Sequence, residues 1–376
     1  MASGSNGHMR GKANLKTSPL PTRRSFVPSP RIRRPLAVAL GLAAALTLAA
    51  CSSGSPASTD DSPTDAGLLP AAEGTTRYPL TLETFAGETV LDERPERVAV
   101  VGFSPNYDAL EAIGVTPVYA LADSEWQWND QQLREDGGFV DTATRADPIN
   151  FEGIAAAEPD LIIATNFIFE QDDYDKLAAI APVLEHPEEV DGAAIDWRDT
   201  HRLIGETLDL ADAAESAITE ADETIAAVAD AHPGFAGTTA TIAYHYTGFP
   251  LEYYSPAGGT LEQILLELGF DANPLAEQFT EVPEVPDENL AQLEADRLVV
   301  FYDSDEERVD RESRPLFQSI PAVAEGRYLP VVLSDAEGVY SPEANVTWVL
   351  RRGASALSLP WAAEILADWL EQAGQA

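Results

Sequence analysis

The sequence predicts an α/β protein with two lobes, each built on a central, mainly parallel sheet, and one long α-helix between them. Two observations lead to this prediction. A helix–turn–strand pattern at residues 150–166 returns at residues 287–302 with the residue types in the same register. Between the two copies, residues 211–231 are rich in Ala and place apolar residues at helical spacing. The same pattern on both sides of a helical connector indicates two lobes with the same architecture.

The length and order of the segments set the expected boundaries. With 376 residues, 45% of them hydrophobic, the chain can bury the cores of two α/β lobes. We expect a signal peptide at 1–50, a lipidated flexible tether at 51–76, an N-terminal α/β lobe at 77–208, a connecting helix at 209–233 and a C-terminal α/β lobe at 234–376.

The charge of the chain is strongly negative. It has 63 Asp and Glu against 23 Lys and Arg, and eight of the basic residues lie in the first 50 residues, which contain no acid. Lys176 is the only lysine beyond that segment. Such a surface repels nucleic acid and anionic lipid headgroups, so we expect neither as a partner. The acidity is expected to act as a solvated surface that keeps the protein soluble.

The N-terminus has the features of an export signal. Residues 35–50 form an apolar run that is short for a membrane-spanning helix and typical of a signal-peptide core. It ends at Cys51, the only cysteine, and the sequence Leu-Ala-Ala-Cys resembles a bacterial lipobox. This resemblance implies lipidation of Cys51 and anchoring to the outer face of the cell membrane; a cleavage site that lies near a cysteine by chance is the alternative. Arg23 and Arg24 resemble a twin-arginine signal, and Sec export stays equally open.

The N-terminal lobe is expected to follow a strand–loop–helix order. The spacing predicts a hairpin over 78–90, a buried strand over 98–101, a loop over 102–106 and a helix over 107–113 that Gly114 ends. A second strand is expected over 115–119, and the 150–166 segment adds a helix and the strand 161–164.

The connector and the second lobe continue the same pattern. Helices are predicted over 197–208 and 211–231, the second acting as a strut between the lobes or, alternatively, covering a sheet. The second lobe is expected to contain a strand at 239–244, a helix at 261–268, the repeated helix–turn–strand at 287–302, a strand at 326–333 and a C-terminal helix from about Glu343, broken near Pro360.

Aromatic residues gather in the loops that follow the predicted parallel strands, where α/β proteins bind ligands. Two arginines lie in or near such loops, Arg145 and Arg351. We therefore expect a ligand-binding face that contains Arg145, Phe103, Tyr107, Trp126, Trp128, Phe167, Tyr246, Tyr254, Tyr302 and Arg351. For each single aromatic residue, the alternative is that it only fixes its loop.

No catalytic motif is present in the sequence. There is no GxSxG, Walker, GxGxxG or HExxH pattern, and the five histidines are too dispersed to suggest a zinc site. Binding is therefore favoured over catalysis. We expect no cofactor and no metal bound directly by the protein; a secreted α/β enzyme is the distant alternative.

Three phrases carry a family resemblance: PERVAVVGFSPNYDALEAIGVTPV from Pro95, NFEGIAAAEPDLIIATN from Asn150 and DENLAQLEADRLVVFYD from Asp287. With the lipobox, they resemble the substrate-binding proteins of iron–siderophore, haem and cobalamin ABC importers. The resemblance implies two Rossmann-like lobes joined by one long rigid α-helix, with the ligand in the cleft between them and limited closure on binding. A monomer and an ABC permease/ATPase partner are implied as well. It also implies that Glu152 and Glu288 dock onto the two permease subunits; as the alternative, they only favour the helix dipole.

The same resemblance bears on the ligand. Arg145 matches an arginine that some hydroxamate-siderophore binders place against iron-bound oxygens. The tryptophan that such binders have in the second lobe is absent, and Phe279 stands in that region, which argues against hydroxamate specificity. Anionic catecholates or citrate would need several basic residues, and only Arg145, Arg351 and Arg352 are suitably placed, which favours a neutral or weakly charged ferric chelate. A haem or cobalamin receptor is the alternative, in which His245, Tyr246 or Tyr254 would serve as axial ligand to haem.

Overall fold

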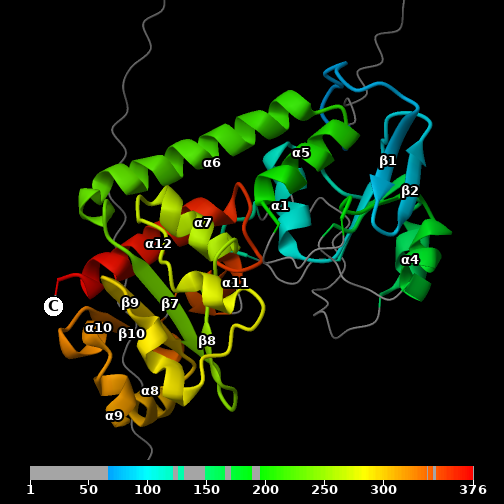
Figure 1. Ribbon diagram of the computed structural model, residues 1–376. Helices are drawn as coiled ribbons and strands as arrows, with labels where there is room; N and C mark the ends of the chain where they lie inside the picture. Colours follow the sequence, from blue (N-terminus) through cyan, green and yellow to red (C-terminus); the bar gives the residue numbers. More distant parts are fainter. Residues whose placement is uncertain are drawn as a thin grey trace, which may run out of the picture. The chain divides into compact units, whose positions relative to one another are not determined.

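The computed structural model describes residues 67–121, 126–130, 149–165, 171–188, 195–336, 338–341 and 344–375. Predictions that concern residues 1–50, Cys51, Arg145 and Phe167 lie outside this part of the chain. The described residues form two lobes, each with a four-stranded sheet. Figure 1 shows the two lobes and the long helix α6.

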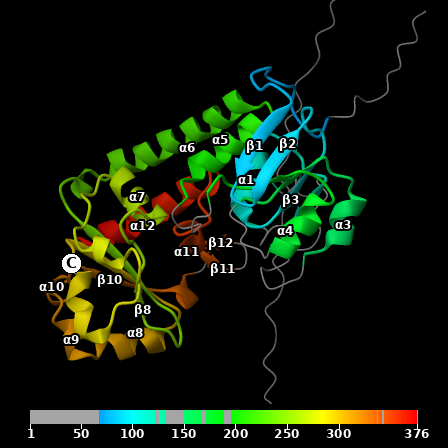
Figure 2. The same cartoon turned by 45° about the vertical axis from the view of Figure 1, so that its right-hand side comes forward.

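The first lobe is built on a fully parallel sheet of strand order β4-β3-β5-β6. Its strands are β3 (Val98–Val101), β4 (Tyr119–Leu121), β5 (Leu161–Ile163) and β6 (Val183–Leu184), and every residue in them is buried. The predicted hairpin is confirmed as β1 (Leu80–Thr84) and β2 (Gly87–Leu91), which pair antiparallel. Figure 2 shows β3 next to this hairpin, with α3 and α4 beyond it.

Two boundaries in the first lobe were predicted wrongly. Helix α1 (Ser104–Ala112) begins in the expected loop, because Pro105 suits the first turn of a helix. The strand expected at 115–119 begins only at Tyr119. The reason is that the amide of Thr116 donates to the carbonyl of Leu68 instead of joining the sheet.

The first helix–turn–strand is confirmed as α3 (Phe151–Ala156) followed by β5. Asn150 caps α3 by accepting a hydrogen bond from the amide of Gly153 at 2.9 Å. A Cβ at position 153 would lie 2.7 Å from the Asn150 side chain, so glycine is required beside this cap. Helices α4 (Gln171–Ala178) and α5 (Trp197–Thr207) complete the lobe.

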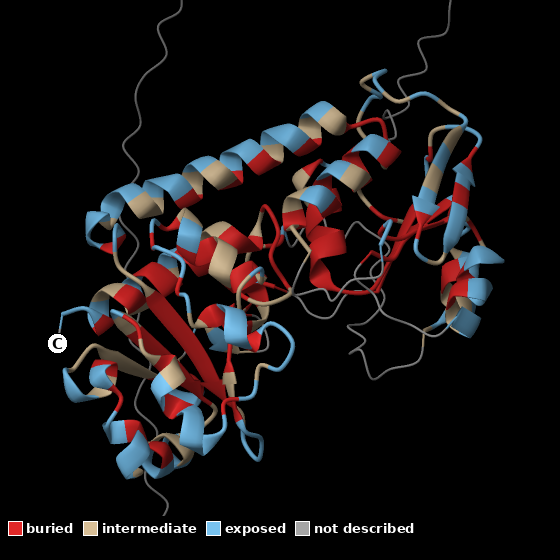
Figure 3. Ribbon diagram, in the orientation of Figure 1, coloured by how far each residue is buried: buried red, intermediate tan, exposed pale blue. Residues whose placement is uncertain are grey.

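The long connector is confirmed as α6 (Ala211–Ala231), a helix of 21 residues. Its buried stripe contributes to two hydrophobic cores: Ala214 packs in the core of the first lobe, whereas Ile218, Ala221 and Ile225 pack in the core of the second. Figure 3 shows this buried stripe along one side of α6 and exposed residues along the other. The helix packs on α5 and on the C-terminal helix α12 (Ser358–Ala373).

The second lobe has a mixed sheet of order β10-β9-β7-β8, in which only β8 is antiparallel. One face packs on α7 (Thr260–Glu267) and α12, and the other packs on the short helices α9 (Pro315–Gln318) and α10 (Pro321–Ala324). The strands are β7 (Ala240–His245), β8 (Leu251–Tyr253), β9 (Arg297–Tyr302) and β10 (Tyr328–Val332), and α8 (Asp305–Glu312) follows β9.

The second helix–turn–strand differs from the first in its helix. Residues Asp287–Leu293 form a 3-10 helix (η4) and not the expected α-helix, and β9 follows it. The position that matches the capping residue Asn150 is Pro286, which has no side-chain acceptor and makes no cap. The repeat therefore keeps its register but loses its N-terminal cap.

The C-terminal helix expected from about Glu343 with a break near Pro360 was predicted with the wrong start and the wrong break. The structure has two helices, α11 (Val346–Val349) and α12, separated by residues 350–357. Pro360 does not break α12 but lies in its first turn, where a missing amide hydrogen costs little. No helix within the described ranges is long and apolar enough to cross a membrane.

Candidate ligand site

An aromatic pocket lies where β7 ends in the second lobe. We call it the tyrosine pocket, and its volume is about 360 Å³. Four tyrosines, one tryptophan and two arginines form most of its lining: Tyr244, Tyr246, Tyr254, Tyr340, Trp348, Arg351 and Arg352, together with Asn345 and Thr347. The strand β7 supplies the first of these residues, and helix α11 with the turn after it supplies the last.

The phenol groups of this pocket are tied to acceptors. Tyr244 donates to Oδ1 of Asp303 at 2.8 Å, and Tyr254 donates to the carbonyl of Thr347 at 2.9 Å. Burial, and then the bond to Asp303, raises the pKa of Tyr244 above its ordinary value; burial likewise raises the pKa of Tyr254 and of Tyr246. These phenols therefore keep their protons, which suits stacking and hydrogen bonding more than coordination of a ferric ion.

Arg351 is a cation of the pocket that an ion pair and an aromatic ring hold in place. Its Nη1 donates to Oε2 of Glu252 at 3.0 Å, and its guanidinium lies over the ring of Tyr254, 5.0 Å from the ring centre. Burial lowers the pKa of Arg351, but the neighbouring Tyr254, Glu252 and Tyr246 outweigh it and raise the pKa overall. The side chain stays charged and held in place.

Trp348 brings the first lobe to this pocket. Its ring centre lies 5.0 Å from that of Phe103, and its Nε1 is 3.3 Å from Oγ of Ser104, at the start of α1. Asn345 fixes Trp348 by capping α11, where its Oδ1 accepts from the Trp348 amide at 2.9 Å. Trp348 was not predicted from the sequence, because it lay inside the single helix expected there. The signal that could have found it is the Asn-Val-Thr-Trp capping pattern.

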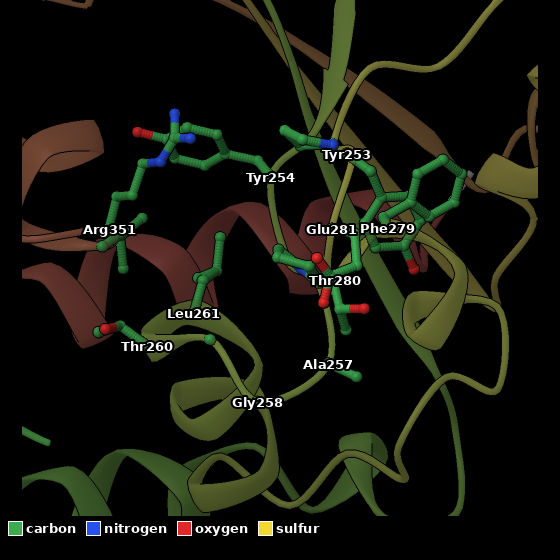
Figure 4. A pocket seen from close by; sticks show the side chains of 14 residues that line it. Tyr253, Tyr254, Ala257, Gly258, Thr260, Leu261, Phe279, Thr280, Glu281 and Arg351 are labelled. Carbon is green, nitrogen blue, oxygen red and sulfur yellow. The ribbon is translucent and has the colours of Figure 1, made fainter. Parts of the chain in front are cut away.

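A second pocket, about 280 Å³ in volume, lies beside the first and is shown in Figure 4. We call it the α7 pocket, because the start of α7 and the loop before it line one side. Tyr254 and Arg351 line both pockets. Phe279, which replaces the expected tryptophan, lies here: it is 3% exposed and stacks on Tyr253 with ring centres 4.4 Å apart. It does not line the tyrosine pocket.

Trp126 and Trp128 lie in the expected loop but pack elsewhere. Their rings stack 5.2 Å apart, and Trp128 also lies 5.2 Å from Trp361 of α12. The Trp128 indole donates to Oδ2 of Asp108 at 3.0 Å, and Trp126 is only 5% exposed. Neither lines the tyrosine pocket or the α7 pocket, so the described contacts give them a role in packing.

Tyr107 and Tyr302 were expected in ligand loops, and this placement was wrong. Tyr107 is 1% exposed inside α1, because that helix starts earlier than predicted. Tyr302 ends β9 fully buried, on the sheet face opposite Tyr244 and Phe301, and its hydroxyl lies 2.9 Å from that of Tyr328. Phe103, Tyr246, Tyr254 and Arg351 are brought together at or beside the tyrosine pocket, whereas Arg145 and Phe167 lie outside the described residues.

The two predicted docking glutamates occupy matching places. Glu152 is exposed in the first turn of α3, and Glu288 is exposed in the first turn of η4. Beside Glu288, Asp287 is already paired with Arg311 at 2.6 Å and with Arg314 at 2.5 Å. Within the described chain, neither Glu152 nor Glu288 takes part in an ion pair, so both carboxylates face solvent.

The described residues contain no group of three or more His, Cys, Asp or Glu that could hold a metal ion. The tyrosine pocket instead offers flat rings, protonated phenols and a fixed guanidinium. Such a surface can stack on an organic ligand and donate hydrogen bonds to its oxygens.

Several solved structures share this fold. The iron uptake ABC transporter substrate-binding protein PiaA of Streptococcus pneumoniae TIGR4 matches with 22% identity and a TM-score of 0.63 over 79% of this chain and 99% of PiaA. PiaA in complex with ferrichrome matches with 20% identity and a TM-score of 0.62 over 78% of this chain and 98% of PiaA. Staphylococcus aureus SirA complexed with staphyloferrin B matches with 19% identity and a TM-score of 0.59 over 78% of this chain and 98% of SirA.

The sequence itself places the chain in a family. No curated protein matches it. The family profile of the periplasmic binding proteins, however, matches residues 100–329, which run from β3 to β10 and include α6. The chain therefore belongs to the periplasmic binding protein family.

Proposed function

We propose that this protein captures a ferric siderophore outside the cell membrane and delivers it to an ABC importer, without turning it over. The observation that carries the proposal is the tyrosine pocket, in which Tyr254 and Arg351 of the second lobe are joined by Trp348 to Phe103 of the first. The likeness to PiaA and SirA, structures solved with ferrichrome and staphyloferrin B, supports it.

The pocket favours iron that arrives already chelated. Tyr244 and Tyr254 donate their hydroxyl protons to fixed acceptors, so neither is poised as a phenolate ligand for bare Fe³⁺. A siderophore surrounds its iron with its own oxygens and presents an organic surface. The rings of Tyr246 and Trp348 can stack on that surface, while the guanidinium of Arg351 can donate to the partly negative oxygens around the iron.

The haem alternative has less support than the siderophore proposal. Of the three residues considered as axial ligands, Tyr254 donates its hydroxyl proton to the Thr347 carbonyl. His245 ends β7 on the other side of the sheet, where its ring meets Tyr302. Only Tyr246 remains in the pocket as a candidate ligand.

We further propose that the protein works as a monomer and that a lipid on Cys51 holds it to the outer face of the cell membrane. Glu152 and Glu288 would then dock one on each permease subunit. The exposed positions of both carboxylates support this role, because a docking charge must be accessible and not neutralised within the chain.

Fluorescence quenching tests the proposed function. Ferric trihydroxamate is expected to quench the tryptophan emission of the purified protein with a saturable curve, whereas haem and free ferric ion should not. Trp348→Phe should remove a substantial part of the quenching. Trp369→Phe is the matched control, since Trp369 packs on Phe301 and lines neither described pocket. Absence of saturable binding by any ferric chelate would contradict the proposal.

A further inference from the structure

Arg351 stands at the wall between the tyrosine pocket and the α7 pocket. Two cations are found among the described lining residues, Arg351 and Arg352. Of these two, Arg351 lines both pockets and Arg352 lines the tyrosine pocket. A ligand in either pocket therefore meets its guanidinium. In Figure 4 the Arg351 side chain reaches the ring of Tyr254 at the edge of the α7 pocket.

Glu252 is placed to pair with Arg351 by the alternation of β8. Leu251 and Tyr253 point to one face of the sheet and pack in its core. Glu252, between them, points to the opposite face and meets Arg351 at 3.0 Å. The two partners lie 99 positions apart in the sequence. The side chain of Glu252 is 22% exposed and that of Arg351 is 30% exposed. The pair is thus partly desolvated and fixed by the fold.

A sheet does not require a carboxylate at this position. Tyr254 already supports the guanidinium from one side through a cation–π contact. Glu252 adds a compensating negative charge, so that a ligand meets the dipole of an ion pair and not an isolated cation. Two other carboxylates lie nearby, and neither has a described ion pair with Arg351: Asp303 accepts from Tyr244 and from the Thr247 amide, and Glu281 lines the α7 pocket.

We propose that Glu252 is a specificity-determining residue: by compensating Arg351, it makes the site select ferric chelates of low net charge and reject polyanionic chelates. This inference rests on the proposed siderophore function and names the class of siderophore. The physical basis is discrimination against the wrong ligand, because a polyanion gains little from a neutralised guanidinium and is repelled by the carboxylate behind it. A neutral chelate can still accept hydrogen bonds from Arg351.

The decisive variant is Glu252→Gln. Glutamine keeps an oxygen that can accept from Arg351 and has almost the same shape, but it carries no charge. Arg351→Gln removes the cation in turn. Glu325→Gln is the control: Glu325 pairs with Arg327 at 3.0 Å, so the substitution makes the same charge change beside an arginine that, unlike Arg351, lines neither pocket.

The experiment measures the affinity of all four proteins for two probes by calorimetry. One probe is ferrichrome, a neutral ferric trihydroxamate, and the other is the trianionic ferric complex of a hexadentate tris-catechol. The natural protein should bind the neutral chelate at least tenfold more tightly. Glu252→Gln should shift that ratio at least tenfold toward the trianion, Arg351→Gln should weaken the trianion further, and Glu325→Gln should leave the ratio unchanged.

The outcomes separate this inference from the proposed function. If the natural protein binds neither chelate, the siderophore function fails and the inference falls with it. If it binds a chelate but prefers the trianion, or if Glu252→Gln folds and keeps the natural ratio, the function stands and the role of Glu252 is overturned. Circular dichroism and thermal melting of each variant establish that the binding data come from folded protein.

Discussion

Ser355 of the segment before α12 donates a hydrogen bond of 2.7 Å to Oδ2 of Asp108 in α1. Asp108 is fully buried and also accepts from Trp128 at 3.0 Å and from Asn129 at 2.8 Å. The Ser355 oxygen in turn accepts from the amide of Ser358, at the start of α12. One buried carboxylate thus joins the first lobe to the N-terminus of the last helix.

This arrangement predicts a specific pH dependence of stability. Burial, although opposed by the hydrogen bonds from Asn129, Ser355 and Trp128, raises the pKa of Asp108 to about 7. In the unfolded chain the pKa of an aspartate is about 4. Between about pH 4 and about pH 7 the folded state therefore binds more protons at Asp108 than the unfolded state, and the free energy of unfolding falls as the pH rises. Above about pH 7 this group has no further effect on that free energy. Asp108→Asn should remove a contribution on the order of 4 kcal/mol across this window.

Urea unfolding of the natural protein and of Asp108→Asn from about pH 4 to about pH 8 measures this effect. The informative quantity is the difference between the two free energies of unfolding at each pH, since other carboxylates such as Asp287 have lowered pKa values and act in the opposite direction. Asp271→Asn, at an exposed position, is the control and should leave the pH profile unchanged. A pH-independent difference for Asp108→Asn would refute the prediction.

Charge reversal at Glu152 and Glu288 should abolish iron uptake but leave chelate affinity within about twofold. The expected partners are cationic sites on two permease subunits, so a positive residue would be repelled, whereas both positions lie outside the two ligand pockets. The measurements are uptake of radiolabelled ferric chelate by cells and binding by the purified double variant. Glu277→Arg, also exposed, should retain uptake. A parallel loss of affinity would argue against a pure docking role.

Replacement of Cys51 by serine should release the protein from the membrane. The thiol is the expected site of lipidation, and a serine hydroxyl does not substitute for it. Cell fractionation followed by immunoblotting measures the distribution, and Ser52→Ala provides a neighbouring control that should stay anchored. Retention of the Cys51→Ser protein in the membrane fraction would refute lipid anchoring.

Arg145→Ala should weaken chelate binding by roughly 1–3 kcal/mol, because its guanidinium is expected to make charge-assisted hydrogen bonds to iron-bound oxygens. Calorimetry with ferric trihydroxamate measures the loss. Arg308→Ala is the matched control, since Arg308 pairs with Asp305 on α8, lines neither pocket and should leave the affinity unchanged. Equal affinities for Arg145→Ala and the natural protein would remove Arg145 from the site.

Local sequence patterns predicted the regular elements well where one face of the element decides its structure. The bounds of α6 and β3 agree with those predicted, since an amphipathic stripe and a short β-branched run are local signals. The break between α11 and α12 was expected near Pro360 but lies at residues 350–357. That segment contains Ser355, which donates to Asp108, a partner 247 positions away that local patterns do not reveal.

The candidate site was predicted less completely, for a reason that β9 illustrates. Every residue from Leu298 to Tyr302 is buried, so hydrophobic alternation could not tell which side chains face which core. Tyr302 was expected in the loop after this strand, but it ends the strand and its ring points to the face opposite Tyr244. The pairing of Glu252 with Arg351 was equally invisible, because it joins an edge strand to a turn far along the chain.

The division of α6 between two cores has a consequence for how the protein unfolds. Ala214 belongs to the core of one lobe, and Ile218, only four residues later in the same unbroken helix, belongs to the core of the other. Loss of either lobe would remove part of the packing of the helix and expose apolar surface. The two lobes should therefore melt together in a single cooperative transition, and neither should be stable when expressed without α6.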